Sequence, residues 1–208
     1  MAQTVIRALA VTVSNRAAAG IYADKSGPVL VELLRSAGCE VVDGPLVIPD
    51  GDPVEAALRD ALAAGYDVVV TTGGTGLTPA DLTPEMTRRV LEREIPGIAE
   101  ALRAAGAAAG VPSAILSRGL AGVADRTLIV NLPGSTGGVR DGMAVLAPVL
   151  GHAISQINGG DHVRADSGAK RLPTIAYRQK RFRGMMRTWD GCAAGLSLSP
   201  SLSCSGSR

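Results

Sequence analysis

Aromatic residues are scarce in this sequence of 208 residues, where Phe, Trp and Tyr together make up 2%. An apolar fraction of 46%, mostly Ala, Val, Leu and Ile, can still supply the core of one sizeable domain with an extension. No apolar run reaches the length of about 18 uncharged residues that a membrane span needs, so we expect none. The first residues also lack a basic segment followed by an apolar one, and we therefore expect no signal peptide.

Cysteine is also rare, with only Cys39, Cys192 and Cys204. Their spacing matches neither a zinc site nor a disulfide framework. We therefore expect a cytoplasmic protein in a reducing compartment.

The net charge of +2 conceals two different parts of the chain. Residues 1–165 hold 13 Lys and Arg against 17 Asp and Glu, whereas residues 166–208 hold 8 against 2. We therefore predict a folded domain over 1–165 and a disordered, basic, Ser-rich tail over 166–208. The acidic balance of the predicted domain argues against nucleic-acid binding.

Apolar runs and turn residues alternate along residues 1–165, which is typical of alternating strands and helices. The expected strands are 7–13, 39–48 (broken at Gly44-Pro45), 67–72, 117–120 and 127–132. The expected helices are 27–37, 53–64 (with Asp52 as N-cap), 83–94, 96–103 and 139–157. This order predicts a three-layer α/β fold with a mostly parallel sheet, whose ligands bind beyond the carboxyl ends of the strands.

The segment Thr71-Thr72-Gly73-Gly74-Thr75-Gly76 directly follows a predicted buried strand. Its glycines permit positive φ and close approach of a ligand, and its N–H groups can form an anion-binding concavity. An ordinary glycine turn is the alternative, and the pattern alone does not decide between the two. No Gly-Lys-Ser/Thr follows, which excludes the common phosphate-binding loop of nucleotide hydrolases.

Two aspartates are expected close to this glycine turn. Asp50 ends the second strand, and Asp81 lies five residues beyond Gly76. Two carboxylates beside a phosphate site suggest Mg²⁺ held by a few oxygens and by substrate phosphates. Capping or turn formation is the commoner role of aspartate, but Asp52 is the better candidate for the cap, which leaves Asp50 without a structural role.

Two further segments combine glycine with a helix start. Asn131-Leu132-Pro133-Gly134-Ser135 leads from a strand into the last helix, and Ser26-Gly27 opens the first one. Each can present N–H groups to an anion or be a simple capped helix. Their predicted location at one edge of the sheet strengthens the case for a shared site.

These residues resemble the molybdopterin-binding family that includes MogA, MoaB and the G domain of gephyrin. The resemblance covers about residues 5–160. Its carriers are Thr71–Gly76, Asp81-Leu82-Thr83-Pro84-Glu85, Glu94-Ile95-Pro96-Gly97, Leu116-Ser117-Arg118 and Asn131–Ser135. It implies a three-layer α/β domain, usually trimeric, and Ile48-Pro49-Asp50 favours the adenylyltransferase members over the MoaB-like ones.

The resemblance implies that AMP passes from MgATP to the terminal phosphate of molybdopterin. Asp50 and Asp81 correspond to the two catalytic aspartates and would hold Mg²⁺. The substrate-binding residues it implies are Ser14, Ser26, Gly27, Thr72, Gly73, Gly74, Thr75, Gly76, Ser117, Asn131, Pro133, Gly134 and Ser135. The chain departs from the family at Asn15, often Asp, and at Ala80, commonly Arg.

Two other functions stay open from the residues. The loss of a cation at Ala80 allows a non-catalytic or MoaB-like protein that binds molybdopterin without releasing pyrophosphate. An unrelated nucleotide-binding α/β domain would bind ATP without the pterin.

Overall fold

The computed structural model describes residues 5–160, so the tail predicted over 166–208 lies outside the described residues. The strands are β1 (Arg7–Val13), β2 (Val41–Ile48), β3 (Val68–Thr72), β4 (Arg93–Glu94), β5 (Ala121–Ala124) and β6 (Thr127–Leu132). The helices are α1 (Asn15–Ala18), α2 (Ser26–Ser36), α3 (Asp52–Ala63), α4 (Thr83–Arg88), α5 (Pro96–Ala108) and α6 (Thr136–Ile157), with a short 3-10 helix at Pro112–Leu116. Among these helices none is long and apolar enough to cross a membrane.

The strands form one six-stranded sheet in the order β2-β1-β3-β6-β5-β4. The first four strands in this order are parallel, β5 pairs antiparallel with β6, and β4 pairs antiparallel with β5. The expected fold class, a mostly parallel α/β sheet between helical layers, is confirmed.

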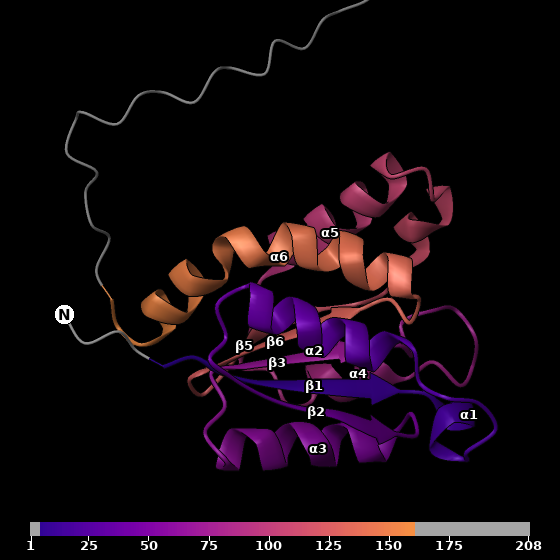
Figure 1. The fold of residues 1–208 in the computed structure, drawn as a ribbon, viewed down its shortest axis with the longest axis horizontal. Coiled ribbons are helices and arrows are strands. Elements are labelled where there is room, and N and C mark those ends of the chain that lie inside the picture. The colour runs from indigo at the N-terminus through magenta and orange to yellow at the C-terminus, as the bar shows by residue number, and fades with distance from the viewer. Residues whose placement is uncertain (1–4, 161–208) are drawn as a thin grey trace, which may run out of the picture. The chain divides into compact units, whose positions relative to one another are not determined.

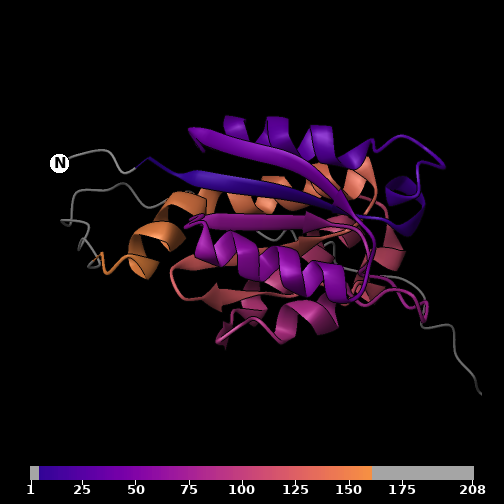
Figure 2. The same ribbon diagram turned by 90° about the horizontal axis from the view of Figure 1, so that it is seen from below.

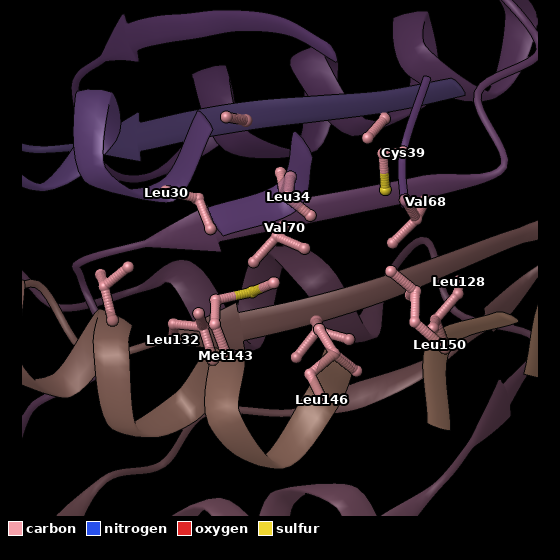
Figure 3. Close-up of a cluster of buried hydrophobic side chains, with 14 of the residues drawn as sticks. Leu30, Leu34, Cys39, Val68, Val70, Leu128, Leu132, Met143, Leu146 and Leu150 are labelled. Atoms are coloured by element: carbon pink, nitrogen blue, oxygen red, sulfur yellow. The ribbon is translucent and has the colours of Figure 1, made fainter. Parts of the chain in front are cut away.

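Helices cover both faces of the sheet. Helices α2, α5 and α6 lie on one face and α3 on the other, as Figure 1 shows and as Figure 2 shows from below. The larger core packs Leu30 and Leu34 of α2, with Met143, Leu146 and Leu150 of α6, against β3 and β6 (Figure 3). A second core packs α3 and α4 against the opposite side chains of β1, β3 and β6. Strand β3 is buried on both faces, which explains its continuous Val68-Val69-Val70 run.

The structure corrects several expected boundaries. Gly44-Pro45 does not break β2, because Gly44 adopts φ +99° and a register shift accommodates the irregularity. Helix α4 ends at Arg88 rather than near 94, because Glu92 donates its N–H to the carbonyl of Val123 and the chain joins β5 as strand β4. Helix α5 instead runs on to Ala108.

The expected strand over 117–120 is also wrong, and β5 begins at Ala121. The N–H of Leu120 donates to Oδ1 of Asn131 at 3.1 Å, and the N–H of Arg118 turns away to the carbonyl of Thr75. The N–H groups of these two residues therefore bond to a side chain and to a distant loop instead of the backbone of a neighbouring strand.

Candidate active site

The parallel strands β1, β2, β3 and β6 end at the same edge of the sheet. Their register pairs Val13 with Ile48, Thr12 with Thr72, and Thr72 with Leu132. The segments that follow these strands therefore converge, and Figure 1 shows α1 at this edge, beyond the arrowheads of β1 and β2.

Two cavities open at this edge. The first has a volume of about 860 Å³, and the predicted residues along its wall are Ser14, Ser26, Asp50, Thr72, Gly73, Gly74, Asp81, Gly134 and Ser135. The second has a volume of about 520 Å³ and is lined by Thr75, Gly76, Ser117, Asn131, Pro133 and Ser135. The structure thus brings together every predicted site residue except Gly27, which is buried against Thr12, Asp24 and Pro45.

The glycine turn after β3 separates the two cavities, because Thr72 to Gly74 line the first and Thr75 and Gly76 line the second. Gly73 and Gly74 have φ values of +108° and +63°, which favour glycine. The N–H of Gly73 is not free for an anion, since it donates to the carbonyl of Leu132 at 3.0 Å. Within residues 5–160, the N–H groups of Gly74, Thr75 and Gly76 have no protein acceptor and remain available.

Each of the two aspartates packs against one glycine of this turn. A Cβ on Gly74 would collide with Oδ2 of Asp50, and a Cβ on Gly76 would lie 2.8 Å from Oδ2 of Asp81. Glycine is therefore required at both positions for the carboxylates to approach the backbone. This contact places both acidic groups directly beside the available N–H groups.

Asp50 has a structural role at α4, although the sequence interpretation gave it none. Its Oδ2 accepts the N–H of Leu82 at 3.0 Å, and its Oδ1 accepts the hydroxyl of Thr83 at 3.1 Å. These bonds hold the start of α4. Asp52 is the first residue of α3 but makes no capping hydrogen bond, and its side chain is 94% exposed.

Asp81 is oriented by the loop that precedes it. Its Oδ2 accepts both the N–H of Thr78 at 2.9 Å and the hydroxyl of Thr78 at 2.7 Å. The other oxygen, Oδ1, accepts no hydrogen bond from the described residues. Asp81 therefore keeps one unused carboxylate oxygen at the wall of the first cavity.

Arg118 is a functional candidate for which the sequence interpretation gave no role. Its Nε donates to the carbonyl of Gly76 at 2.7 Å, and its other nitrogens donate to the carbonyl of Asp81 and to the carboxylate of Glu85. One guanidinium thus fixes both ends of the loop between the glycine turn and Asp81. The only signal in the sequence was its place in Leu116-Ser117-Arg118.

The pKa of Glu85 shows how this contact affects the carboxylate. Burial opposes ionisation, but the hydrogen bond from Arg118 and the charges of Arg118 and Arg88 outweigh it. The pKa of Glu85 is therefore lowered, and the ion pair with Arg118 persists under mildly acidic conditions.

Two residues at the end of β1 hold other parts of the first cavity. The Oδ1 atom of Asn15 accepts the N–H of Asp50 at 2.9 Å. An aspartate at this position could accept the same bond through a carboxylate oxygen. The Oγ atom of Ser14 lies 2.9 Å from the hydroxyl of Tyr22 and also accepts the N–H of Ala17.

The start of α2 already contains a negative charge. Oδ1 of Asp24 accepts the N–H groups of Ser26 and Gly27 at 2.9 and 3.0 Å, and Oδ2 accepts the hydroxyl of Thr12 at 2.7 Å. A substrate phosphate would have to displace this carboxylate to reach the two N–H groups. Anion binding by Ser26 and Gly27 stays a prediction.

The residues at the end of β6 and in the turn after it have two roles, in holding the local structure and in lining the cavities. Ser135 caps α6 by accepting the N–H of Gly138 at 3.0 Å, and it lines both cavities. Asn131 is 1% exposed, and its Nδ2 donates to the hydroxyls of Thr71 and Thr87. The side chain of Asn131 thus ties β6 to β3 and α4 beneath the second cavity.

No group of three or more His, Cys, Asp or Glu side chains within residues 5–160 could alone hold a metal ion. Mg²⁺ commonly takes only one or two protein carboxylates and completes its octahedral shell with water and phosphate oxygens. Asp50 and Asp81, with the unused oxygen of Asp81, fit this kind of ligand set.

Comparison with known proteins gives consistent matches. The profile of a family described as "Probable molybdopterin binding domain" matches residues 9–152. The molybdopterin adenylyltransferase of Helicobacter pylori (strain J99) is 36% identical over 154 residues, which cover 70% of this chain and 84% of that protein. The molybdenum cofactor biosynthesis bifunctional protein of Synechococcus elongatus is 36% identical over 74% of this chain, and the chain spans about half its length, 48%.

Solved structures agree with these matches. The molybdopterin biosynthesis Mog protein from Mycobacterium ulcerans is 51% identical, with a TM-score of 0.70 over 73% of this chain and 99% of that one. The molybdopterin biosynthesis enzyme MoaB from Thermus thermophilus is 43% identical, with a TM-score of 0.68 over 74% and 97% of the two chains.

Proposed function

The chain belongs to the molybdopterin-binding family of molybdenum-cofactor biosynthesis, and we propose that it is a molybdopterin adenylyltransferase. It transfers AMP from MgATP to the terminal phosphate of molybdopterin. The observation that carries the proposal is the glycine turn between two cavities, with the carboxylates of Asp50 and Asp81 against its glycines. The similarity to proteins named molybdopterin adenylyltransferase supports it.

The two cavities suit different substrates. The first combines the two carboxylates with the cationic side chains of Arg16 and Lys25, which suits MgATP. The second combines the apolar side chains of Leu102 and Leu116 with polar groups of Ser117, which suits a flat heterocycle with hydrogen-bonding edges. We assign the second cavity to the pterin, so that its phosphate reaches the glycine turn.

The reaction needs positioning and charge neutralisation more than proton transfer. An oxygen of the terminal pterin phosphate forms a bond to the α-phosphorus of ATP, and the bond from that phosphorus to the bridging oxygen breaks as pyrophosphate leaves. The N–H groups of Gly74 to Gly76 hold the phosphate oxygens in line. Asp50 and Asp81 would hold Mg²⁺, which supplies positive charge to the triphosphate when bound. An ionised phosphate needs no general base.

Pyrophosphate release from MgATP in the presence of molybdopterin tests the proposal. Asp50→Asn and Asp81→Asn each remove one charge with little change of shape, and we expect the rate to fall about 100-fold or more. Asp52→Asn is the matched control, because this neighbouring carboxylate is exposed and caps no helix. Normal rates in both site variants would refute the metal assignment, and no pyrophosphate from the wild type would refute the activity.

A non-catalytic, MoaB-like pterin-binding protein is the second candidate, and Ala80 favours it. Ala80 lines the first cavity where a family member commonly has an arginine, so one phosphate-binding cation is missing. Such a protein would bind molybdopterin in titration calorimetry and release no pyrophosphate. Assembly as a homotrimer also stays a prediction, which light scattering of the full chain would test.

A further inference from the structure

Tyr22 places an exposed aromatic ring at the wall of the first cavity. Within residues 5–160 the only aromatic side chains are Tyr22 and Tyr66, so a ring in a binding cavity is unusual for this chain. Tyr22 lies between α1 and α2 and is 46% exposed, so burial in the core does not explain its position.

Two contacts hold the ring of Tyr22 in place despite this exposure. Its hydroxyl lies 2.9 Å from Oγ of Ser14, and the guanidinium carbon of Arg16 lies 5.4 Å from the ring centroid. Cation–π attraction of this kind favours a fixed relative orientation of the two groups. A ring that is already ordered loses less conformational entropy when a ligand stacks on it.

The ring is also connected to the proposed reaction centre. Ser14, which contacts Tyr22, is followed directly by Asn15, whose Oδ1 accepts the N–H of Asp50 at 2.9 Å. Two consecutive residues that follow β1 therefore contact the ring and the backbone of Asp50, one of the two proposed metal ligands. Both groups line the same cavity of about 860 Å³.

We propose that Tyr22, held by Ser14 and Arg16, is the stacking platform for the nucleobase of the nucleotide substrate. This inference rests on the proposed function. Nucleobases stack on aromatic rings and on guanidinium planes, and every base offers a π-face for this contact. The platform therefore favours a nucleoside triphosphate over a bare triphosphate, while the glycine turn and the two aspartates bind the phosphate chain.

Titration calorimetry of the full chain with Mg²⁺ tests the platform, using ATP and inorganic tripolyphosphate as separate ligands. Tyr22→Leu should weaken ATP binding about tenfold or more and leave tripolyphosphate binding unchanged, because only ATP has a base to stack. Tyr22→Phe keeps the ring and should retain most of the affinity for ATP.

Tyr66→Leu is the matched control. The Tyr66 ring also has an arginine beside it, with the guanidinium carbon of Arg7 4.8 Å from the ring centroid, but Tyr66 lines a different cavity. Tyr66→Leu should bind both ligands as tightly as the wild type does. Thermal melts of each variant check that it is folded. Unchanged ATP affinity in Tyr22→Leu, or an equal loss for both ligands, would overturn the platform.

The outcomes separate this inference from the proposed function. If the wild type releases pyrophosphate but Tyr22→Leu binds ATP normally, the platform is wrong and the activity stands. If the wild type releases none but Tyr22→Leu selectively loses ATP affinity, the activity is wrong and the platform stands. A wild-type chain that binds no ATP overturns both.

Discussion

Gly74 and Asp50 are in direct contact, so that any side chain on Gly74 would meet the carboxylate oxygen Oδ2 of Asp50. The hydroxyl of Thr83 lies equally close to that position, and Gly74 has φ +63°. Steric space and backbone conformation both require glycine here.

Gly74→Ala should therefore displace Asp50 and reduce stability by about 1–3 kcal/mol. We expect pyrophosphate release to fall more than the folded fraction does, because the displaced carboxylate belongs to the proposed metal site. Urea denaturation and the pyrophosphate assay measure the two effects. Gly97→Ala is the control, since Gly97 lies in α5 with open space around it and should tolerate a methyl group. Wild-type stability in Gly74→Ala would contradict the close contact.

The buried amide of Asn131 should be more important for folding than for substrate contact. Its Nδ2 donates to the hydroxyls of Thr71 and Thr87, both at 3.0 Å, and its Oδ1 accepts the N–H of Leu120. Asn131→Asp replaces the two donors with a buried carboxylate, so we expect a loss of about 1–3 kcal/mol at neutral pH. Part of this loss should be regained at low pH, where protonation restores a donor. Denaturant midpoints at pH 7 and pH 4.5 provide the check, and equal losses at both would count against the buried charge.

The lowered pKa of Glu85 predicts a specific dependence of stability on pH. Burial alone would raise its pKa, but the hydrogen bond and charge of Arg118 outweigh burial and hold the pKa in the folded chain below its ordinary value of 4.5. The carboxylate thus contributes stability above the unfolded pKa, and this contribution is lost as pH falls through the folded pKa. When the pH falls from about 5 to about 3, the free energy of unfolding should therefore decrease less in Glu85→Gln than in the wild type.

The matched background for this measurement is Arg118→Met, which removes the cation. Introduced there, Glu85→Gln should no longer reduce the loss of stability on acidification, because the main interaction that lowers the pKa of Glu85 is absent and burial opposes ionisation. An unchanged effect in that background would assign the pH dependence to another group. Midpoints of urea unfolding across the pH series give the comparison.

Cys39 should resist alkylation in the native protein. It is 3% exposed, and burial, together with the nearby charge of Asp67, raises the pKa of its thiol to about 11. Little thiolate is then present at pH 8, and thiolate is the reactive form. Peptide mass spectrometry after iodoacetamide treatment should find Cys39 unmodified in buffer and modified in urea. Rapid modification of Cys39 in buffer would contradict its burial.

The parts of the fold that depend on local pattern could be predicted from the sequence. Strands β1 and β6, which are continuous apolar runs, have the expected bounds. Ser135 caps α6 as expected. Parallel strands share one carboxyl edge, so the meeting of Asp50 with the glycine turn also followed from the predicted topology.

The parts that depend on distant contacts could not be predicted. Arg118 contacts the carbonyl of Gly76, 42 residues away, and no local pattern indicates which loop a guanidinium will reach. The bond from Leu82 to Asp50 could not be predicted because it joins residues 32 positions apart, and Gly51, rather than Asp52, is the N-cap residue of α3. Helix α4 is short because pairing with β5 overrides the helical tendency after Arg88.

Asp24 makes the start of α2 a weaker anion site than its N–H groups alone would be. Its carboxylate occupies the positive end of α2, so the attraction that this helix would offer to a phosphate is already neutralised from within the chain. The available N–H groups lie instead at the glycine turn, where Gly74 lines the same cavity. A phosphate can reach these N–H groups without displacing Asp24, whereas it would have to displace Asp24 to reach those at the start of α2. The same aspartate that stabilises α2 thereby directs a phosphate toward the glycine turn.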